Sequence, residues 1–456
     1  MLVDVSSRIA TNPALLQSGV AVTDWPGAGR SAFVVAGFNG PNRVLCWEDG
    51  ALADTFDPVV ADPAHSAVAV AVADVDGDGR EELYVLNAAP GSGGRRSRDR
   101  LFRAGGGEGP VDLLDQPGCD HPAAPRPGRC VAALDRGGDG RYGFVVTDQG
   151  GPLRLYEVTD DGRVADRALD AGLAYAASGR SLLCLPLISE HAMDVVAGNE
   201  GAANFVFRHT GNGRYDEVAT AAGLADPEED AAALAPVDVD GDGRLDLVAG
   251  SWAGSHRLWL RDDREGFFDV APAAVAAPSR ARTVIAADLD NDGEVELFFN
   301  GFGEANRLFA RRDGRWVQVG CGQAVEASGL GTGAAVADID GDGVLELLVA
   351  HGGAQAPQPL SLYKVPGAAR NSWIRVLPRT RQGAPARGAV VRVHAGGRVQ
   401  VRAIDAGSGL GQAEPVAHVG LGGQQLVERV EVSWPDGSTA VVASPPSGRL
   451  LEVAHP

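Results

Sequence analysis

The chain repeats a nine-residue acidic loop, and the spacing of its copies restricts the possible folds more than any other feature. Four intact copies begin at Asp74, Asp238, Asp288 and Asp338. Each has carboxylates at positions 1, 3, 5 and 9 and a glycine at position 6. Alternate residues of a tight loop can direct oxygens at one centre, glycine allows the turn, and Ca²⁺ prefers about six to eight oxygen ligands. Each copy therefore predicts a calcium site.

The predicted ligands are the acidic positions of each loop together with its seventh residue. In chain order they are Asp74, Asp76, Asp78, Arg80 and Glu82; Asp238, Asp240, Asp242, Arg244 and Asp246; Asp288, Asp290, Asp292, Glu294 and Glu296; and Asp338, Asp340, Asp342, Val344 and Glu346. Ligand charge and site rigidity set calcium affinity, so we expect about four permanently filled structural Ca²⁺ sites and not calcium sensors.

The spacing of the loops gives the number of structural units. The last three loops start 50 residues apart, and the interval between Asp74 and Asp238 leaves room for two more units. Degenerate copies with fewer carboxylates lie at residues 22–37, 133–140 and 185–198. A fixed period of this length is typical of a repeat architecture. The sequence therefore predicts seven units.

Each unit has the pattern of four short strands. An apolar run precedes the loop and another follows it, as at residues 67–73 and 245–250; a third carries alternating aromatic residues, and a fourth follows a glycine turn. Such runs, bounded by Gly, Asp and Asn, predict strands and turns. Repeated seven times, they predict an all-β fold, a seven-bladed β-propeller over residues 1–368. The last unit lacks a fourth run, so we expect residues 1–6 to close its blade and cover the open edge.

Residues 369–456 depart from the repeat and have the pattern of a small β domain packed on the propeller. They resemble the ASPIC/UnbV domain at residues 387–393, 407–412, 418–422 and 430–437. The repeats themselves resemble the FG-GAP/VCBS units of integrin-like propellers. A propeller followed by this domain is similar to the cartilage acidic protein 1 family, and that resemblance implies calcium in the four intact loops.

Composition excludes some classes of function. The net charge is −20, which argues against nucleic-acid binding, and much of the acidity belongs to the predicted metal loops. No stretch approaches the roughly 18 apolar residues that span a membrane. Residues 1–22 lack a leader pattern, and the five cysteines are an odd number. These features predict a cytoplasmic protein with free thiols; the alternatives are a secreted protein whose leader was removed and a Cys119–Cys130 disulfide.

The end of the channel opposite the acidic loops is the candidate ligand site. It is lined by the residue about six positions before each loop, which contributes Arg129, Arg180 and Arg282 from three different blades. Glu200, Asp230 and His65 fall nearby, and a basic stretch with Arg95 and Arg96 either covers the mouth or is a solvated loop. Arginine forks can bind a carboxylate or phosphate while a Glu or His moves protons. Alternatively, the arginines pair with neighbouring carboxylates and line a wet channel.

Three classes of function remain after these exclusions. The first is a calcium-binding module that takes a small anionic or polar ligand, or a protein partner, at the channel mouth. The second is a cofactor-free cyclase, isomerase, lyase or hydrolase; UnbV-type domains resemble proteins of bacterial natural-product pathways, and the Ala/Gly/Arg-rich composition fits that setting. The third is a secreted adhesion-type protein. A zinc site at Cys119, Asp120, His121 and Cys130 has suitable ligand types but no recognised spacing.

Overall fold

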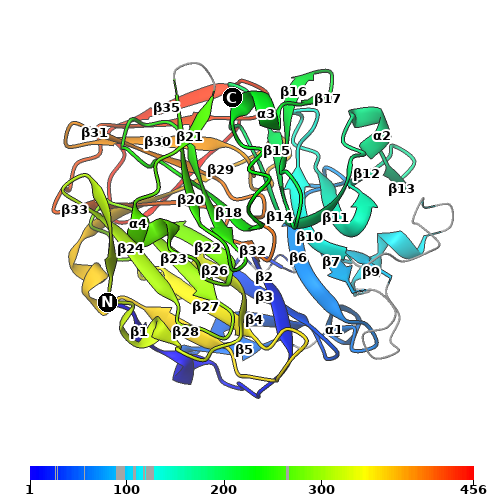
Figure 1. Cartoon of the computed structure of the whole chain (residues 1–456), viewed down its shortest axis with the longest axis horizontal. Helices are drawn as coiled ribbons and strands as arrows, with labels where there is room; N and C mark the ends of the chain where they lie inside the picture. Colours follow the sequence, from blue (N-terminus) through cyan, green and yellow to red (C-terminus); the bar gives the residue numbers. More distant parts are fainter. Residues whose placement is uncertain are drawn as a thin grey trace.

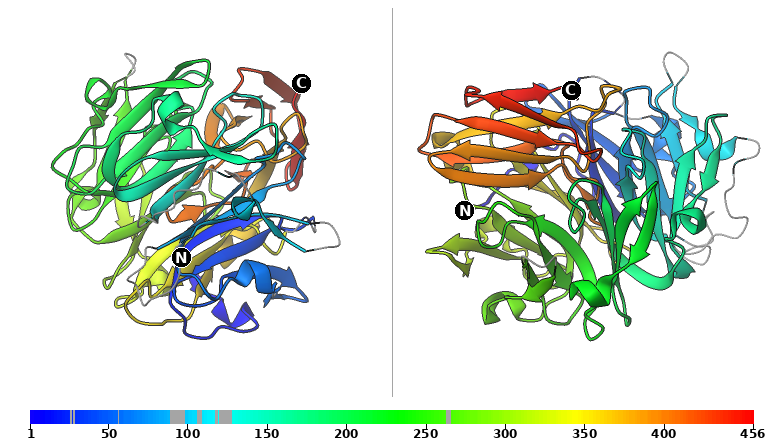
Figure 2. Two further views of the ribbon diagram at one scale, coloured as in Figure 1. Left: turned by 90° about the vertical axis from the view of Figure 1, so that its right-hand side faces the viewer. Right: turned by 90° about the horizontal axis from the view of Figure 1, so that it is seen from above.

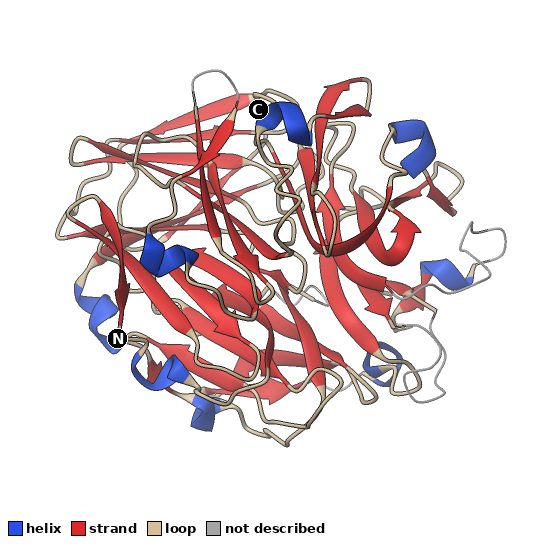
Figure 3. Cartoon of the chain, in the orientation of Figure 1, coloured by secondary structure: helices blue, strands red, loops and turns tan. Residues whose placement is uncertain are grey.

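The structure is a computed structural model of the chain that describes residues 1–456 except 26, 28, 56, 89–97, 106–108, 117–118, 120–127 and 263–265. Arg95, Arg96, Asp120 and His121 therefore lie outside the described residues. Strands dominate the fold, with short helical turns between blades (Figure 3). These turns are α1 (Pro58–Ala61), α2 (Ala168–Ala171), α3 (Ala219–Ala222), α4 (Ala273–Ala276), η1 (Ser6–Arg8), η2 (Leu113–Asp115), η3 (Gly322–Val325) and η4 (Pro366–Arg370).

The seven-bladed propeller expected from the repeats is confirmed, and each blade is an antiparallel sheet of four strands. Blades 1 to 3 are β2 (Gln17–Thr23), β3 (Ala32–Gly37), β4 (Arg43–Glu48) and β5 (Ala51–Asp54); β6 (Ala67–Ala73), β7 (Glu82–Asn87), β8 (Arg100–Arg103) and β9 (Val111–Asp112); and β10 (Gly128–Leu134), β11 (Gly143–Pro152), β12 (Arg154–Val158) and β13 (Val164–Asp166). Blades 4 to 6 are β14 (Ala176–Leu185), β15 (Asp194–Asn199), β16 (Phe205–Gly211) and β17 (Arg214–Glu217); β18 (Ala231–Val237), β19 (Asp246–Ser251), β20 (Arg257–Arg261) and β21 (Phe267–Asp269); and β22 (Ala281–Ala287), β23 (Glu296–Gly301), β24 (Arg307–Arg312) and β25 (Arg315–Val319).

Blade 7 joins the two ends of the propeller sequence. Its strands are β26 (Gly331–Ala337), β27 (Glu346–His351), β28 (Ser361–Lys364) and β1 (Val3–Asp4). Val3 pairs with Lys364 and Asp4 with Tyr363, so the start of the chain lies beside β28 (Figure 1). This pairing covers the edge that β28 would otherwise expose.

The first strands of the blades form a closed ring, in which β26 of blade 7 contacts β2 of blade 1. Small residues allow the first strands of neighbouring blades to pack this closely. A Cβ atom added to Gly19 would lie 2.8 Å from the Cα of Ala69, and one added to Gly333 would lie 2.8 Å from the Cα of Gly19. The runs of Ala, Gly and Val in the first strands are therefore a packing requirement at the propeller axis.

The C-terminal domain is built from two sheets. One contains β33 (Ala417–Gly422), β29 (Ser372–Pro378) and β36 (Leu450–Val453), and the other contains β31 (Arg398–Ala403), β30 (Val390–Ala395), β34 (Arg429–Ser433) and β35 (Thr439–Ala443). Ile374, Val391, Val419 and Trp434 are buried between them. Figure 2 shows this domain, orange to red, gathered at one side of the molecule.

The channel loop, which we define as residues 405–413, runs from this domain into the ring of first strands. Within it β32 (Gly411–Gln412) pairs in parallel with β2 (Figure 1). Val72 donates its amide hydrogen to Gln412 Oε1 over 2.7 Å. Gly411 has no room for a side chain, because a Cβ there would lie 2.4 Å from the carbonyl oxygen of Ala334. The loop therefore fills the centre of the propeller from the side that the C-terminal domain occupies.

Candidate metal loops and the arginine cluster

The four intact loops share one hydrogen-bonding scheme. The carboxylate at position 1 accepts from the amide of the glycine at position 6 over 2.9–3.0 Å. The carboxylate at position 9 accepts from the amide at position 2 over 2.7–3.0 Å. The carboxylate at position 3 accepts from the amide at position 5 over 3.1–3.2 Å. The repeated sequence therefore folds into the same turn in blades 2, 5, 6 and 7.

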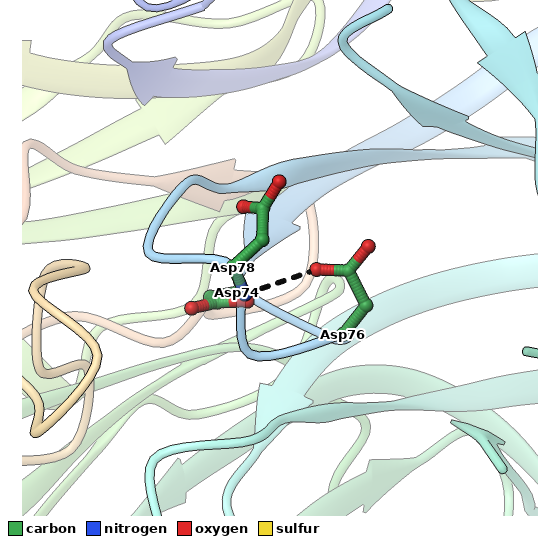
Figure 4. Close-up of side chains that lie close together, drawn as sticks. All are labelled: Asp74, Asp76 and Asp78. Carbon is green, nitrogen blue, oxygen red and sulfur yellow. Dashed lines mark hydrogen bonds between the residues drawn. The ribbon is translucent and has the colours of Figure 1, made fainter. Parts of the chain in front are cut away.

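This turn brings predicted ligands together in every intact loop. Figure 4 shows the side chains of Asp74, Asp76 and Asp78 close together on the turn of blade 2. In each loop three carboxylates offer oxygens within 4.8 Å of one another. The other three clusters are Asp238, Asp240 and Asp246; Asp288, Asp290 and Glu296; and Asp338, Asp340 and Glu346.

The seventh residue of each loop offers no free side-chain ligand. Arg80 and Arg244 pair with the fifth-position carboxylates of their own loops. Glu294 accepts from Arg398 over 2.5 Å, and Val344 is a buried apolar residue. Among the predicted ligands, these positions can contribute through their main-chain oxygens, as position 7 does in other calcium loops.

The buried carboxylates of the loops fit a divalent cation. In blade 6, Asp288 Oδ1 and Glu296 Oε1 are buried without a hydrogen-bond partner among the described residues. Burial raises the pKa of Glu296 to about 9 and that of Asp288 to about 7, and burial likewise raises the pKa of Glu82 in blade 2 to about 9. The nearby Arg402 offsets only part of the buried charge in blade 6, because the pKa of Asp288 stays raised beside it. Burying uncompensated charge is unfavourable, so these loops can hold an ion such as Ca²⁺.

The degenerate loops close themselves with hydrogen bonds. In blade 3, Asp135 accepts from the amides of Gly138 and Gly140 over 2.7 and 2.9 Å. In blade 4, Asp194 accepts from the amides of Ile188 and Ser189, each over 2.7 Å. Asp74 of blade 2 accepts the same pair of glycine bonds as Asp135, so the degenerate turns differ from the intact loops in the carboxylates they lack and not in this bonding.

Buried basic residues of the C-terminal domain reach the face that carries the acidic loops, and the sequence pattern does not indicate them. Arg387 is fully buried and donates to Glu81 Oε1 over 2.6 Å, beside the ninth loop position of blade 2. Arg375 donates to Asp338 Oδ2 over 2.8 Å in blade 7. The many acidic residues of the predicted loops could have indicated that a basic surface covers this face.

At the other end of the first strands, Arg129, Arg180 and Arg282 each lie at a β-bulge. The register of the first and second strands shifts between Gly128 and Cys130, between Gly179 and Ser181, and between Ala281 and Thr283. A bulge inserts one extra residue and redirects its side chain. The bulges therefore bring arginines of blades 3, 4 and 6 to the rim of the channel.

These arginines form a cluster with one carboxylate and two aromatic rings. Glu200 accepts from Arg129 and from Arg180, each over 2.5 Å. The guanidinium carbon of Arg282 lies 5.3 Å from the ring centre of Trp252 and 5.5 Å from that of Phe302. Arg282 has no carboxylate partner among the described residues. The cluster therefore contains three guanidinium groups and a single carboxylate.

Charge in the cluster is fixed at neutral pH. The hydrogen bond from Arg180, with a further one from Arg129, lowers the pKa of Glu200. Burial and the nearby Arg180 lower the pKa of Arg282 to about 10, which leaves this guanidinium protonated at pH 7. The cluster is consequently a cationic site whose one acid is held as a carboxylate.

The remaining two predicted residues have other partners. Asp230 accepts from the amide of Gly201 over 2.7 Å, so it holds the turn after Glu200. His65 is buried and contacts Asp62, with 2.6 Å between Nδ1 and Oδ1. Trp252 and Phe302 were not predicted, although each directly follows the second strand of its blade, where the repeat could have indicated them.

Comparison with known proteins agrees with this architecture. Residues 379–456 match the family model described as ASPIC and UnbV. Residues 192–249, 238–299 and 288–349 match the FG-GAP-like repeat. The solved structure of BBS1N in complex with ARL6DN is 11% identical, with a TM-score of 0.51 over 80% of this chain and 97% of that one, and it supports the fold alone.

The comparisons do not support two predictions, one about cellular location and one about a bacterial pathway. The chain is similar to cartilage acidic protein 1, a secreted extracellular matrix protein, and this likeness contradicts the predicted cytoplasmic location. That prediction came from the start of the chain and its cysteine count, neither of which decides a compartment. The matched relatives are vertebrate, so the bacterial natural-product setting has no support. No helix among the described residues is both long and apolar enough to cross a membrane.

The similarity covers nearly the whole molecule. Cartilage acidic protein 1 of Xenopus tropicalis is 39% identical over 98% of this chain and 75% of its own length. The Homo sapiens protein is also 39% identical, over 98% of this chain and 73% of its own length. By this likeness, and by its FG-GAP-like propeller and ASPIC/UnbV domain, the chain belongs to the cartilage acidic protein 1 family.

Proposed function

We propose that this protein is a calcium-stabilised binding module. In this proposal, Ca²⁺ in the acidic loops holds the face on which the C-terminal domain docks. The arginine cluster at the opposite end of the first strands binds a small ligand that carries a carboxylate, sulfate or phosphate group. The single observation that carries the binding role is Arg282, a guanidinium placed against two adjacent aromatic rings without a carboxylate partner among the described residues.

The chemistry of the cluster suits an oxyanion. Guanidinium groups present several N–H donors in a planar fork that matches a carboxylate or a phosphate. The Nε atoms of Arg180 and Arg282 are buried without a hydrogen-bond partner among the described residues. Trp252 lies 5.3 Å from both guanidinium carbons and holds the two side chains in place. A bound anion would neutralise the positive charge of the arginines that Glu200 compensates only in part.

The geometry favours binding over catalysis. A cofactor-free hydrolase, lyase, isomerase or cyclase needs a group that exchanges protons near neutral pH. The lowered pKa of Glu200 makes it a poor general acid. His65, the other predicted proton carrier, is buried against Asp62. An enzyme would need a proton-transfer group at the cluster, whereas the charge of Glu200 does not change near neutral pH.

The test is a calorimetric titration of calcium-loaded protein with succinate and with sulfate. Arg282→Met removes the guanidinium and keeps an unbranched apolar side chain. A hydrogen bond to a charged group contributes about 1.5–3 kcal/mol, so the affinity should fall roughly 10- to 100-fold. Arg315→Met, an exposed residue of β25, makes the same charge change and should leave the affinity unaltered. Equal affinities in wild type and Arg282→Met would refute the binding site.

A further inference from the structure

The four intact loops are not equivalent, because Lys364 places an ammonium group inside the loop of blade 7. Lys364 Nζ lies 3.0 and 2.8 Å from the two carboxylate oxygens of Asp340 and 2.9 Å from Asp342 Oδ1. It also donates to Glu346 Oε1. Only 8% of the lysine side chain is exposed. One buried cation thus contacts the carboxylates at loop positions 3, 5 and 9.

These are the oxygens that a metal ion would need. Asp340 and Glu346 belong to the three-carboxylate cluster of this loop. A Ca²⁺ ion binds its oxygens at about 2.3–2.6 Å, so its position would coincide with that of the ammonium nitrogen. Two cations cannot share this centre, because they would repel one another at contact distance in a buried site. The blade-7 loop therefore does not fit the metal that its sequence predicts.

Strand register explains why this happens in blade 7. Lys364 lies on β28 directly opposite Glu346, the ninth residue of the loop. In blade 6 the residue opposite Glu296 is Ala310, which carries no charge. In blade 5 the register of Leu247 with Trp259 places the apolar Leu260 at the matching position. The built-in cation is thus a property of the third strand and not of the loop.

Blade 2 has a basic residue at the matching position, but this residue stays at the rim of the loop. Leu83 pairs with Phe102, so Arg103 is the counterpart of Lys364. Arg103 contacts Asp76 at 3.3 Å, and 42% of its side chain is exposed. A surface ion pair of this kind is weak, and it leaves the interior of the loop accessible to an ion.

A second cation adds to the charge compensation in blade 7. Arg375 of the C-terminal domain pairs with Asp338 over 2.8 Å and with Glu414 over 2.5 Å, and its side chain is 10% exposed. Asp338 Oδ1 alone among the blade-7 carboxylate oxygens is buried without a hydrogen-bond partner among the described residues. Arg375 therefore compensates the carboxylate at loop position 1, which Lys364 does not contact.

We infer that the ammonium group of Lys364 takes the place of a metal ion in blade 7, and that Ca²⁺ binds in the loops of blades 2, 5 and 6. This inference rests on the proposed calcium binding and refines it from four ions to three. It also means that the contact between blade 7 and the C-terminal domain, through Arg375, is independent of metal.

The first test counts ions. Protein stripped with EDTA, reloaded with Ca²⁺ and freed of unbound metal should contain three calcium ions per chain by atomic emission. A count of four would overturn the inference and leave the proposed calcium binding intact. A count of zero would overturn the proposed calcium binding itself, and the inference with it.

Matched substitutions identify the loops that bind. Asp290→Asn and Asp340→Asn change the same loop position in blades 6 and 7 and preserve the size of the side chain. Asp290→Asn should lower the count by one, whereas Asp340→Asn should leave it unchanged. Loss of one ion in Asp340→Asn would overturn the inference. Circular dichroism establishes that both variants are folded before the ions are counted.

A substitution of the lysine should create the missing site. Lys364→Met removes the ammonium and exposes the carboxylates of blade 7 to metal, so the count should rise by one in excess calcium. Arg103→Met, the matched change in blade 2, should leave the count unaltered. An unchanged count in folded Lys364→Met would show that the lysine does not exclude the ion, and would overturn the inference.

Discussion

The two ends of the first strands differ in whether the same residues recur from blade to blade. At one end, the acidic turn recurs in four blades with the same hydrogen bonds. At the other end, every blade again has a strand irregularity, but the residue there is arginine in blades 3, 4 and 6 and Val68 or Ala232 in blades 2 and 5. The repeated end forms the same turn in blades 2, 5, 6 and 7. The variable end forms an asymmetric cluster of arginines from three blades, which is the proposed anion site.

The ends also differ in how their charge is compensated. Basic residues of the C-terminal domain reach into the acidic face, as Arg387 does with Glu81. The arginine cluster is compensated only in part, by Glu200. We therefore expect changes on the acidic face to alter stability and changes at the arginine cluster to alter binding.

Removal of calcium should have the largest effect. Each site stabilises the folded state by about 4 kcal/mol when free Ca²⁺ exceeds its dissociation constant a thousandfold. For several sites we expect EDTA to lower the melting temperature by roughly 10 °C or more, measured by scanning calorimetry. Addition of Mg²⁺ with the EDTA controls for general ionic effects. An identical melting curve with and without EDTA would remove the structural role of the metal.

Deletion of residues 1–8 should have the next largest effect, because it removes β1 and the buried Leu2. Loss of one buried leucine side chain costs about 2–5 kcal/mol, and the uncovered edge of β28 adds to this cost. Chemical denaturation should show a loss of roughly 5 kcal/mol or more. Val3→Ala, at an exposed position of the same strand, should change stability by under about 1 kcal/mol. Full stability of the truncated chain would show that blade 7 needs no closure.

Arg387→Met tests the buried ion pair between the domains. Removing one partner leaves Glu81 buried without its cation, which costs about 3–5 kcal/mol. Arg381→Met is the control, since its pair with Asp436 is exposed and contributes about 0–1 kcal/mol. Denaturation of both variants in the presence of calcium measures the difference. Equal stabilities would mean that the domain docks without this pair.

Arg282→Met should barely change stability while it weakens anion binding roughly 10- to 100-fold. A buried cation without a carboxylate partner pays for its desolvation, so an apolar replacement should be neutral or stabilising by about 1 kcal/mol. A large loss of stability would reassign Arg282 to the scaffold.

Anion affinity should be independent of pH between 6 and 9. Glu200 is already a carboxylate in this range because its pKa is lowered, and Arg282, with a pKa of about 10, remains protonated. Affinity should fall as the pH rises through 10, because the guanidinium of Arg282 then loses its charge. Titrations with sulfate, whose charge is constant over this range, measure the profile. A fall in affinity between pH 6 and 8 would point to a titrating group outside the cluster.

The sequence predicted the features that depend on one repeat. The acidic loops, the seven blades and the positions of Arg129, Arg180 and Arg282 all follow from spacing within about 50 residues. The missed features depend on contacts between distant segments. Lys364 is identified only by its register with Glu346, and Gln412 only by its insertion against Val72. A single sequence without an alignment does not encode such pairings in its local pattern.

One titration series tests most directly whether the acidic end of the first strands stabilises the fold while the arginine end binds the ligand. Succinate affinity is measured by calorimetry in calcium-loaded wild type, Asp290→Asn and Arg282→Met, with the melting temperature of each recorded beside it. We predict that Asp290→Asn melts at a lower temperature and binds succinate with the wild-type affinity, whereas Arg282→Met keeps its melting temperature and binds succinate roughly 10- to 100-fold more weakly. If Asp290→Asn weakens succinate binding as much as Arg282→Met does, metal and ligand act at one coupled site, and the division between scaffold and binding end is wrong.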